Sequence, residues 1–399
     1  MHGLILAISI WAPYAVDVSK PGLRDRFNLL KGTDFLHFYT LGSLAILGRG
    51  SDLYDTVAQA ALARQLVPGV EGVYFVALYG PQVSLFFASL AIVPYAWALI
   101  AWWLLTTLVF LGCCNAIWRL CPNLQRYGPL VLILGLAYPA FFHLIAWGQT
   151  SAPALFCFVL AYVGLHNRQE FLAGLAIGLL AFKPPLGLAA AFIFVFASQW
   201  RVVIGAVASM LAQFAAAWLY YGASVMRDYY DALRNFPRVA PFLEPRPYDM
   251  HSLRALWVLL LPWPRVISVL WVISSAIVLW AAILLWRSAA PLPIRFSALL
   301  LATVLVAPHL TVYDLVILAP VFLFLTDWIL ENPRHDVAGT TALLLYLAYI
   351  LPLLSPVTGW TRLQFSVLVF VGLLACTWRM VREPGILPQP AALLSEQEG

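Results

Sequence analysis

Charge is the scarcest property of this sequence. Only 10% of its 399 residues are charged, whereas soluble domains average about 25%. Hydrophobic residues make up 63%, against about 45–50% in soluble domains. This composition excludes a soluble globular protein and predicts a polytopic membrane protein.

Cysteine is also scarce, and the sequence has no run of basic residues of the kind that binds nucleic acid. None of the five cysteines has the spacing to histidines that a zinc site requires. The formal net charge of +5 comes from lysines and arginines scattered over the loops, as is typical of membrane edges. We therefore expect no cofactor, no thiol chemistry and no nucleic-acid partner.

Apolar segments are what the sequence has in abundance. They predict an all-α integral membrane protein with about 10–12 transmembrane helices in one domain over residues 1–382. The first segment lacks the basic region and cleavage site of a signal peptide, so we interpret it as a first span. Residues 383–399 are predicted to be a disordered cytoplasmic tail. The segments are 3–16, 96–118, 128–146, 150–166, 171–182, 186–198, 202–221, 266–286, 294–307, 312–330, 340–354 and 363–380, with a re-entrant or interfacial run at 83–94.

Arginines mark one side of the membrane. With a cytoplasmic N-terminus, nearly every short cytoplasmic loop contains an arginine, as the positive-inside rule requires. Residues 17–82 and 222–265 then form two long extracytoplasmic loops, although their twelve Lys and Arg residues run against the rule. Most of the unusual polar residues gather on this side, so one aqueous face carries the chemistry.

The stretch "GTDFLHFYT" contains an acid in a segment that is too polar to cross a bilayer and too apolar to be exposed to water. Apolar side chains recur at helical spacing over residues 35–47, which predicts a helix that lies flat in the membrane interface. Asp34 begins this helix, and His37 follows one turn later on the same side. From the local sequence, an ordinary N-cap carboxylate and a general base fit Asp34 about equally well.

Two more acids follow in "GRGSDLYD", residues 48–55. This glycine-rich turn predicts a second interfacial helix that opens near Asp55. Asp52 and Asp55 could bind a divalent metal together with Asp34. We favour a turn residue and a helix cap, so no metal site is predicted.

A helix break is predicted at "FKPPLG", residues 182–187, because two prolines discourage a continuous helix. The apolar segments on either side are short for a bilayer, and broken helices at membrane depth line polar cavities. Lys183 lies at the break. It is either a side chain that snorkels to the surface or a cation that binds phosphate, and we favour the phosphate.

Two further segments carry polar groups at the ends of spans. "APHLTVYDLVILAP", residues 307–320, holds His309, Tyr313 and Asp314. Ionisable groups inside membranes are rarely without function, so a proton relay or phosphate contact is slightly favoured over a structural pair. "AWGQTSAP", residues 146–153, offers Gln149 as a sugar contact, or Trp147 as an interfacial anchor.

Five segments occur in a set order over about residues 30–330. They are "TDFLHFYTLGSLAILGRGSDLYD", "YGPQVSLFFASLAIVP", "GQTS", "FKPPLG" and "PHLTVYDLVIL". In this order, the segments resemble glycosyltransferase family 87. None is diagnostic alone, but five in order on a twelve-segment backbone are fairly specific.

The resemblance implies a GT-C-type fold and an inverting glycosyltransferase that uses a polyprenyl-phosphate-linked sugar. Asp34 matches the family's first-loop acid, the expected general base. Lys183 and His309 match positions near the donor phosphate. The lipid tail is expected in a groove formed by segments 35–47 and 83–94. The side chains expected to contact substrate are His37, Tyr39, Tyr54, Gln149, Tyr313 and Asp314.

The resemblance also implies a setting. Mannose is the favoured sugar, with arabinose, glucose and galactose left open, and the acceptor is a lipid or glycan hydroxyl. We expect a multi-pass protein of the bacterial inner membrane, with its active site on the extracytoplasmic side and a role in cell-envelope glycolipid synthesis.

Two other functions fit parts of the sequence. A transporter or flippase for a lipid-linked or anionic substrate would also use broken helices and intramembrane charges. Two large polar loops, with an acid in the first, and the lack of a clear inverted repeat favour the enzyme. A non-catalytic membrane scaffold is the third interpretation, and it would tolerate loss of the Asp34 carboxylate.

Overall fold

The computed structural model of the chain describes residues 2–70, 78–243 and 246–382. These residues fold almost entirely into helices, and two isolated β-bridges are the only extended pairings among them. The predicted all-α fold is therefore confirmed. The tail predicted at residues 383–399 lies outside the described residues.

In the part of the chain that the structure describes, five helical segments are long and apolar enough to cross a membrane. The segment formed by η2 and α6 is followed by α7, and the two are bent by 46° at the break between Leu136 and Pro139. Counted as one, they make a sixth span. The predicted multi-pass class is confirmed, and every one of these segments coincides with a predicted apolar segment. The five are Tyr95–Trp118 (α5), Trp200–Tyr221 (α11), Pro264–Trp286 (α14), Val312–Glu331 (η5 and α16) and Ala338–Thr361 (α17, η6 and α18); the bent one is Pro122–Tyr127 (η2), Gly128–Leu136 (α6) and Pro139–Trp147 (α7).

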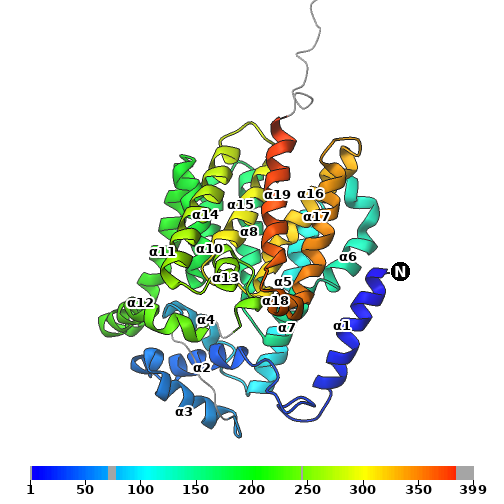
Figure 1. Cartoon of the computed structure of the whole chain (residues 1–399). Coiled ribbons are helices and arrows are strands. Elements are labelled where there is room, and N and C mark those ends of the chain that lie inside the picture. The colour runs from blue at the N-terminus through cyan, green and yellow to red at the C-terminus, as the bar shows by residue number, and fades with distance from the viewer. Residues whose placement is uncertain (1, 71–77, 244–245, 383–399) are drawn as a thin grey trace, which may run out of the picture.

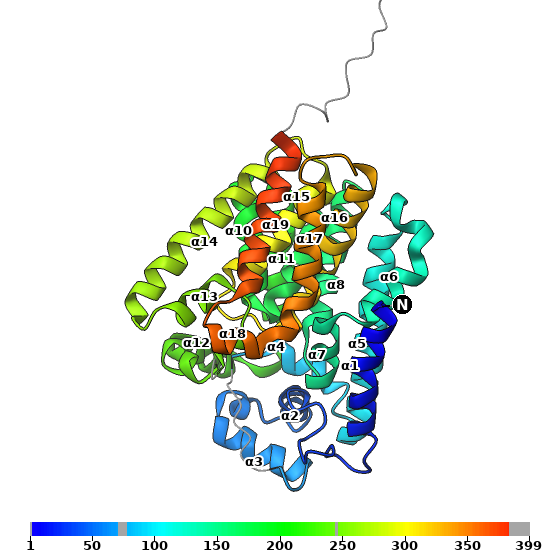
Figure 2. The ribbon, with the colours of Figure 1, turned by 45° about the vertical axis from the view of Figure 1, so that its right-hand side comes forward.

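Shorter apolar helices complete the bundle. Helix α15 is its centre, since nearly its whole length is buried against α10, α14, α16 and α19. Figures 1 and 2 show these helices side by side, with α1 and α6 at one edge. The shorter helices are α1 (His2–Val18), α8 (Ser151–His166), α9 (Glu170–Leu179), α10 (Pro184–Phe196), α15 (Leu292–Val306) and α19 (Phe365–Arg382).

The first long loop folds into a cap at one end of the bundle (Figure 1). It comprises α2 (Phe35–Ile46), η1 (Gly50–Tyr54), α3 (Thr56–Leu66) and α4 (Gln82–Ala88). The sequence predicted that one face of α2 is open to the membrane interface. The structure differs, because α3, α4 and α5 surround α2 and ten of its twelve residues are buried. Gly42 contacts the backbone of Phe87 in α4, so the groove expected between these two segments for a lipid tail is closed.

The second long loop meets the first at the same end of the bundle (Figure 1). The sequence predicted no helix here, but α12 (Ala223–Leu243) and α13 (Leu253–Leu260) form, with η4 (Pro247–Asp249) between them. In α12 the apolar residues recur at helical spacing among the charges, which makes the helix strongly amphipathic. Its Tyr229 ring lies 5.6 Å from the ring of Tyr54. The two polar loops thus form one surface.

Close glycine contacts join α9 to α11. A Cβ atom added to Gly174 would collide with the carbonyl of Val202, and one added to Gly178 would collide with that of Ala206. Small residues four positions apart let helix backbones approach in membranes, where packing and interhelical contacts drive association. These contacts hold α9, and with it the predicted helix break at its end, against a long membrane helix.

We expect Gly174→Ala to lower the free energy of unfolding by about 1–3 kcal/mol, because the added methyl group forces two backbones apart. Gly112→Ala on α5 is the matched control, since a Cβ there meets no atom within 4 Å. It should leave stability unchanged or raise it by about 0.5–1 kcal/mol. Thermal unfolding of the purified variants in detergent checks both, and equal melting temperatures would contradict the close contact.

Candidate active site

Asp34 occupies the N-cap position of α2 but does not act as a cap. Its side chain accepts no hydrogen bond from the first turn of the helix. The side-chain amide of Gln149 instead donates to its Oδ2 at 2.6 Å. Among the described residues, its other carboxylate oxygen has no hydrogen-bond donor. The interpretation of Asp34 as an ordinary N-cap is therefore wrong.

A glycine brings Gln149 to Asp34. Helix α7 ends at Gly148, which has a left-handed backbone with φ of 71°. This conformation is easy for glycine and strained for other residues. A Cβ at Gly148 would lie only 2.7 Å from that of Phe35, so the lack of a side chain also lets α2 approach. The backbone N–H of Asp34 donates to the Trp147 carbonyl at 3.0 Å and fixes the two segments together.

Lys183 lies at the predicted helix break, which is confirmed. The 3-10 turn η3 (Leu180–Phe182) ends immediately before it, and Pro184 and Pro185 begin α10 immediately after it. The Lys183 ammonium forms an ion pair with Asp314 Oδ1 and donates to Ser151 Oγ at 2.7 Å. Its side chain is only 12% exposed, so it does not snorkel to the surface.

Asp314 is held on both of its oxygens. Ser151, at the start of α8, donates to Oδ1 at 2.6 Å, and the backbone N–H of Thr311 donates to Oδ2 at 3.2 Å. The second contact belongs to a capping box at the start of η5 (Val312–Leu318). The neighbouring Tyr313 places its ring 5.4 Å from the Lys183 ammonium. Asp314 and Tyr313, both predicted site residues, thus lie at the break with Lys183.

The environments of the two acids differ. Burial raises the pKa of Asp34 to about 6, although the Gln149 hydrogen bond and the positive charge of Lys183 lower it in part. Asp314, in contrast, has a direct cationic partner. A carboxylate with a pKa near neutrality is suited to accept a proton from a substrate and to release it again.

Tyr79 also lies at this site, although it was not among the predicted site residues. Burial raises its pKa, and the charges of Asp314 and Asp34 raise it further, so its hydroxyl remains protonated at neutral pH. Its ring lies 5.6 Å from that of His37 in an edge-to-face arrangement. His37 therefore borders the site through Tyr79.

Other predicted site residues have structural partners. The hydroxyl of Tyr39 donates to the Val93 carbonyl at 2.9 Å, and that of Tyr54 donates to the Tyr79 carbonyl at 3.1 Å. Their contacts with substrate stay predictions. His309 is half-buried and follows Pro308, whose carbonyl accepts a hydrogen bond from Arg254 at 3.4 Å. Arg254, in α13, was not among the predicted site residues.

Asp52 and Asp55, the two acids of the glycine-rich turn, have structural partners. Asp52 forms an ion pair with Arg49 at 2.5 Å. Asp55 caps α3 by accepting from the backbone N–H groups of Val57 and Ala58 at 2.9 and 3.0 Å. Within the described residues, no group of three or more His, Cys, Asp or Glu side chains is arranged to hold a metal ion.

Comparison with known families identifies the family of the chain. The sequence model of glycosyltransferase family 87 matches residues 77–310, more than half of the chain. The chain belongs to glycosyltransferase family 87. The match contains Gln149, Ser151 and Lys183, while Asp34 and Asp314 lie outside it and reach it through the hydrogen bonds described above. No curated protein and no solved structure matches the chain.

The fold and the family together make the protein a membrane glycosyltransferase. Family 87 membership selects this function over a transporter or a scaffold. It also implies that the chain binds a sugar donor and an acceptor.

Asp34→Asn should make the protein more stable at neutral pH. Because the folded state raises the pKa of Asp34 from 3.8 to about 6, its favourable contribution is present below pH 4 and is lost as the pH rises through about 6. The neutral amide avoids this loss. We expect a gain of about 1–3 kcal/mol at pH 7.5 that shrinks towards pH 4, measured by thermal unfolding across this range.

The control is Asp336→Asn, an exposed carboxylate that pairs with Arg379. Its stability should differ from that of wild type by less than about 0.5 kcal/mol. A destabilised Asp34→Asn protein at pH 7.5 would contradict the raised pKa of Asp34.

Lys183→Met and Asp314→Asn should each destabilise the protein by about 3–5 kcal/mol, because each leaves a buried charge without its partner. The double variant should cost less than the two single variants together, by at least about 1 kcal/mol. The exposed pair Arg379 and Asp336 serves as a matched control, with an expected coupling of about 0–1 kcal/mol. Additive effects at Lys183 and Asp314 would rule out their coupling.

Proposed function

We propose that this glycosyltransferase moves a single sugar, with mannose favoured, from a polyprenyl-phosphate-linked donor to a hydroxyl of a lipid or glycan acceptor. The reaction inverts the anomeric centre and uses Asp34 as the general base. The observation that carries the proposal is the state of Asp34: a half-buried carboxylate of raised pKa, held by Gln149, with one oxygen unoccupied among the described residues.

The reaction is a single displacement. The acceptor hydroxyl oxygen forms a bond to the anomeric carbon while the bond from that carbon to the donor phosphate breaks. The hydroxyl proton passes to Asp34, and the electron pair of the broken bond leaves with the phosphate. Gln149 orients the base by holding Oδ2, so that Oδ1 faces the acceptor. The phosphate is already a good leaving group, so no general acid is required.

Lys183 is suited to hold the departing phosphate. An ammonium group has three N–H donors, and Lys183 uses two of them on Ser151 and Asp314. The third is available to a phosphate oxygen. The pair with Asp314 is formally neutral, so a second cation is needed to balance the leaving group. Arg254, which donates a hydrogen bond to the Pro308 carbonyl, supplies this charge in our proposal, and the adjacent His309 is a further contact to the phosphate.

The depth of the site suits a lipid-linked donor. Helices α8 and α10 run from Ser151 and Lys183 to the other end of the bundle in 16 and 13 residues. These lengths correspond to about 24 and 20 Å, less than the roughly 30 Å of bilayer hydrocarbon. A phosphate bound at Lys183 thus lies near the membrane boundary while its polyprenyl chain stays in lipid.

The arginines of the short loops support a cytoplasmic location for the opposite end of the bundle, and Asp34 is on the extracytoplasmic side in this proposal. A bacterial inner membrane and a role in cell-envelope glycolipid synthesis belong to the same proposal. A GT-C-type architecture is part of the same proposal, because an acid in the first long loop of a polytopic bundle is its expected arrangement.

Asp34→Asn should reduce sugar transfer by about 10²–10⁴-fold, the range typical of a lost general base. The assay supplies purified protein with labelled polyprenyl-phosphate sugars and a membrane lipid extract, and counts the label in the product. Asp52→Asn is the matched control, because it removes an acid from the same loop that pairs with Arg49. It should transfer sugar as wild type does.

The pH profile gives a second measurement in the same assay. The wild-type rate should fall below about pH 6, as the base becomes protonated. If folded Asp34→Asn protein transfers sugar at the wild-type rate, Asp34 is not the base. If wild type transfers none of the labelled sugars, the polyprenyl-phosphate donor is wrong while the family assignment stands.

A further inference from the structure

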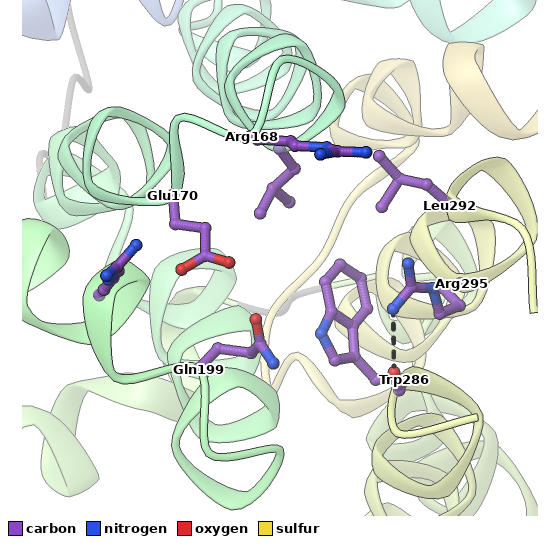
Figure 3. A pocket seen from close by; sticks show the side chains of 8 residues that line it. Arg168, Glu170, Gln199, Trp286, Leu292 and Arg295 are labelled. Atoms are coloured by element: carbon purple, nitrogen blue, oxygen red, sulfur yellow. Dashed lines mark hydrogen bonds between the residues drawn. The ribbon is translucent and has the colours of Figure 1, made fainter. Parts of the chain in front are cut away.

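A polar cavity lies at the end of the bundle opposite Asp34. It has a volume of about 490 Å³ and is bordered by the end of α8, the starts of α9, α11 and α15, and the end of α14. Figure 3 shows side chains from these elements turned towards a common space. Helices α8 and α10 separate it from Lys183, so it is not part of the transferase site.

Three arginines and one acid give the cavity a positive charge. Arg168 lies in the connection between α8 and α9, whereas Arg201 and Arg295 lie in the first turns of α11 and α15. Among the described residues, Glu170 is the only acid that lines the space. The formal charge of the lining is therefore positive. Among the described residues, Glu170 forms no ion pair with any of these arginines, so their charges are not neutralised locally.

Arg295 is held in place by Trp286. Its guanidinium lies 5.5 Å from the centre of the indole ring and donates to the Trp286 carbonyl at 3.3 Å (Figure 3). Its Nε is buried and has no hydrogen-bond partner in the described part of the chain. A buried donor without a partner is costly, and an anion in the cavity would satisfy it.

Helix ends add to the positive potential. Helices α9, α11 and α15 all begin at the cavity, and none has a side-chain cap at its N-terminus. The first N–H groups of a helix lack partners within the helix and carry partial positive charge. Three such ends beside three arginines form a site for an oxyanion.

We propose that this cavity binds a phosphate group, either in the headgroup of an anionic lipid or as free phosphate. Arginine matches phosphate geometry with paired N–H donors, and Trp286 with two leucines of the lining provides an apolar wall for the carbon chain of a lipid. The site lies at the end of the bundle assigned above to the cytoplasm, and it can be occupied independently of catalysis.

Native mass spectrometry of the purified full-length protein tests this proposal. The protein is titrated with dioleoyl phosphatidylglycerol and, separately, with dioleoyl phosphatidylcholine. Wild type should bind the anionic lipid more tightly, and Arg201→Gln with Arg295→Gln should weaken that binding by about tenfold or more, because two charge-assisted contacts are lost. Arg334→Gln is the control, an exposed arginine at the same end that does not line the cavity.

The variant Glu170→Gln tests the same site if the double arginine variant fails to fold. Removal of the only acid should strengthen binding of phosphatidylglycerol a few-fold, which a misfolded protein would not show. Displacement of the lipid by millimolar inorganic phosphate assigns the site to phosphate itself, and persistence of the lipid assigns it to the headgroup. Equal binding of both lipids by wild type, or unchanged binding in Glu170→Gln, overturns the proposal.

Discussion

The ion pair between Lys183 and Asp314 is the contact on which the site depends. Lys183 ends one half of a helix broken by proline, and Asp314 begins the segment that follows α15. Ser151 joins both of them to the start of α8. Three chain segments far apart in sequence therefore meet around one charge pair. The charge pair is buried, so a shift of any of the three segments would separate the charges and leave one of them unpaired in an apolar environment.

Asp34 is attached to this centre through Gln149, two residues before Ser151. The turn at Gly148 thus serves both carboxylates: the residue after it holds Asp34, and the start of the next helix holds Asp314. One acid is paired with a cation and the other is only hydrogen-bonded by an amide. This difference in partners, rather than any difference in residue type, separates a structural carboxylate from a candidate base.

Much of the fold could be predicted from the sequence, because membrane helices consist of continuous apolar segments that can be recognised directly. The break at Lys183 was also predictable, since proline removes a backbone donor wherever it occurs. Helix α12 was missed because its many charges suggested a loop, although its apolar period was helical. The position predicted for α2 was wrong, because an apolar helix face can pack against lipid or against other helices, and the sequence pattern is the same in both cases.

The site residues were harder to predict for a different reason. A cap and a base have the same local sequence, and only the Gln149 contact distinguishes them at Asp34. Tyr79 and Arg254 carried no local signal, because a tyrosine before a turn and an arginine in a polar loop are common. Their positions follow from how the loops pack over the bundle, which no short window of sequence contains.

The unequal lengths of the helices have a consequence for how the enzyme meets its substrate. Helix α11 has 22 residues and α10 only 13, so the start of α10 lies about 13 Å short of the end of its neighbour. For the lipid-linked donor proposed above, a site set back in this way would be reached by lateral diffusion within the bilayer plane. The search for a lipid-linked donor is then two-dimensional, and its rate depends on the amount of donor per membrane area rather than on its concentration in water.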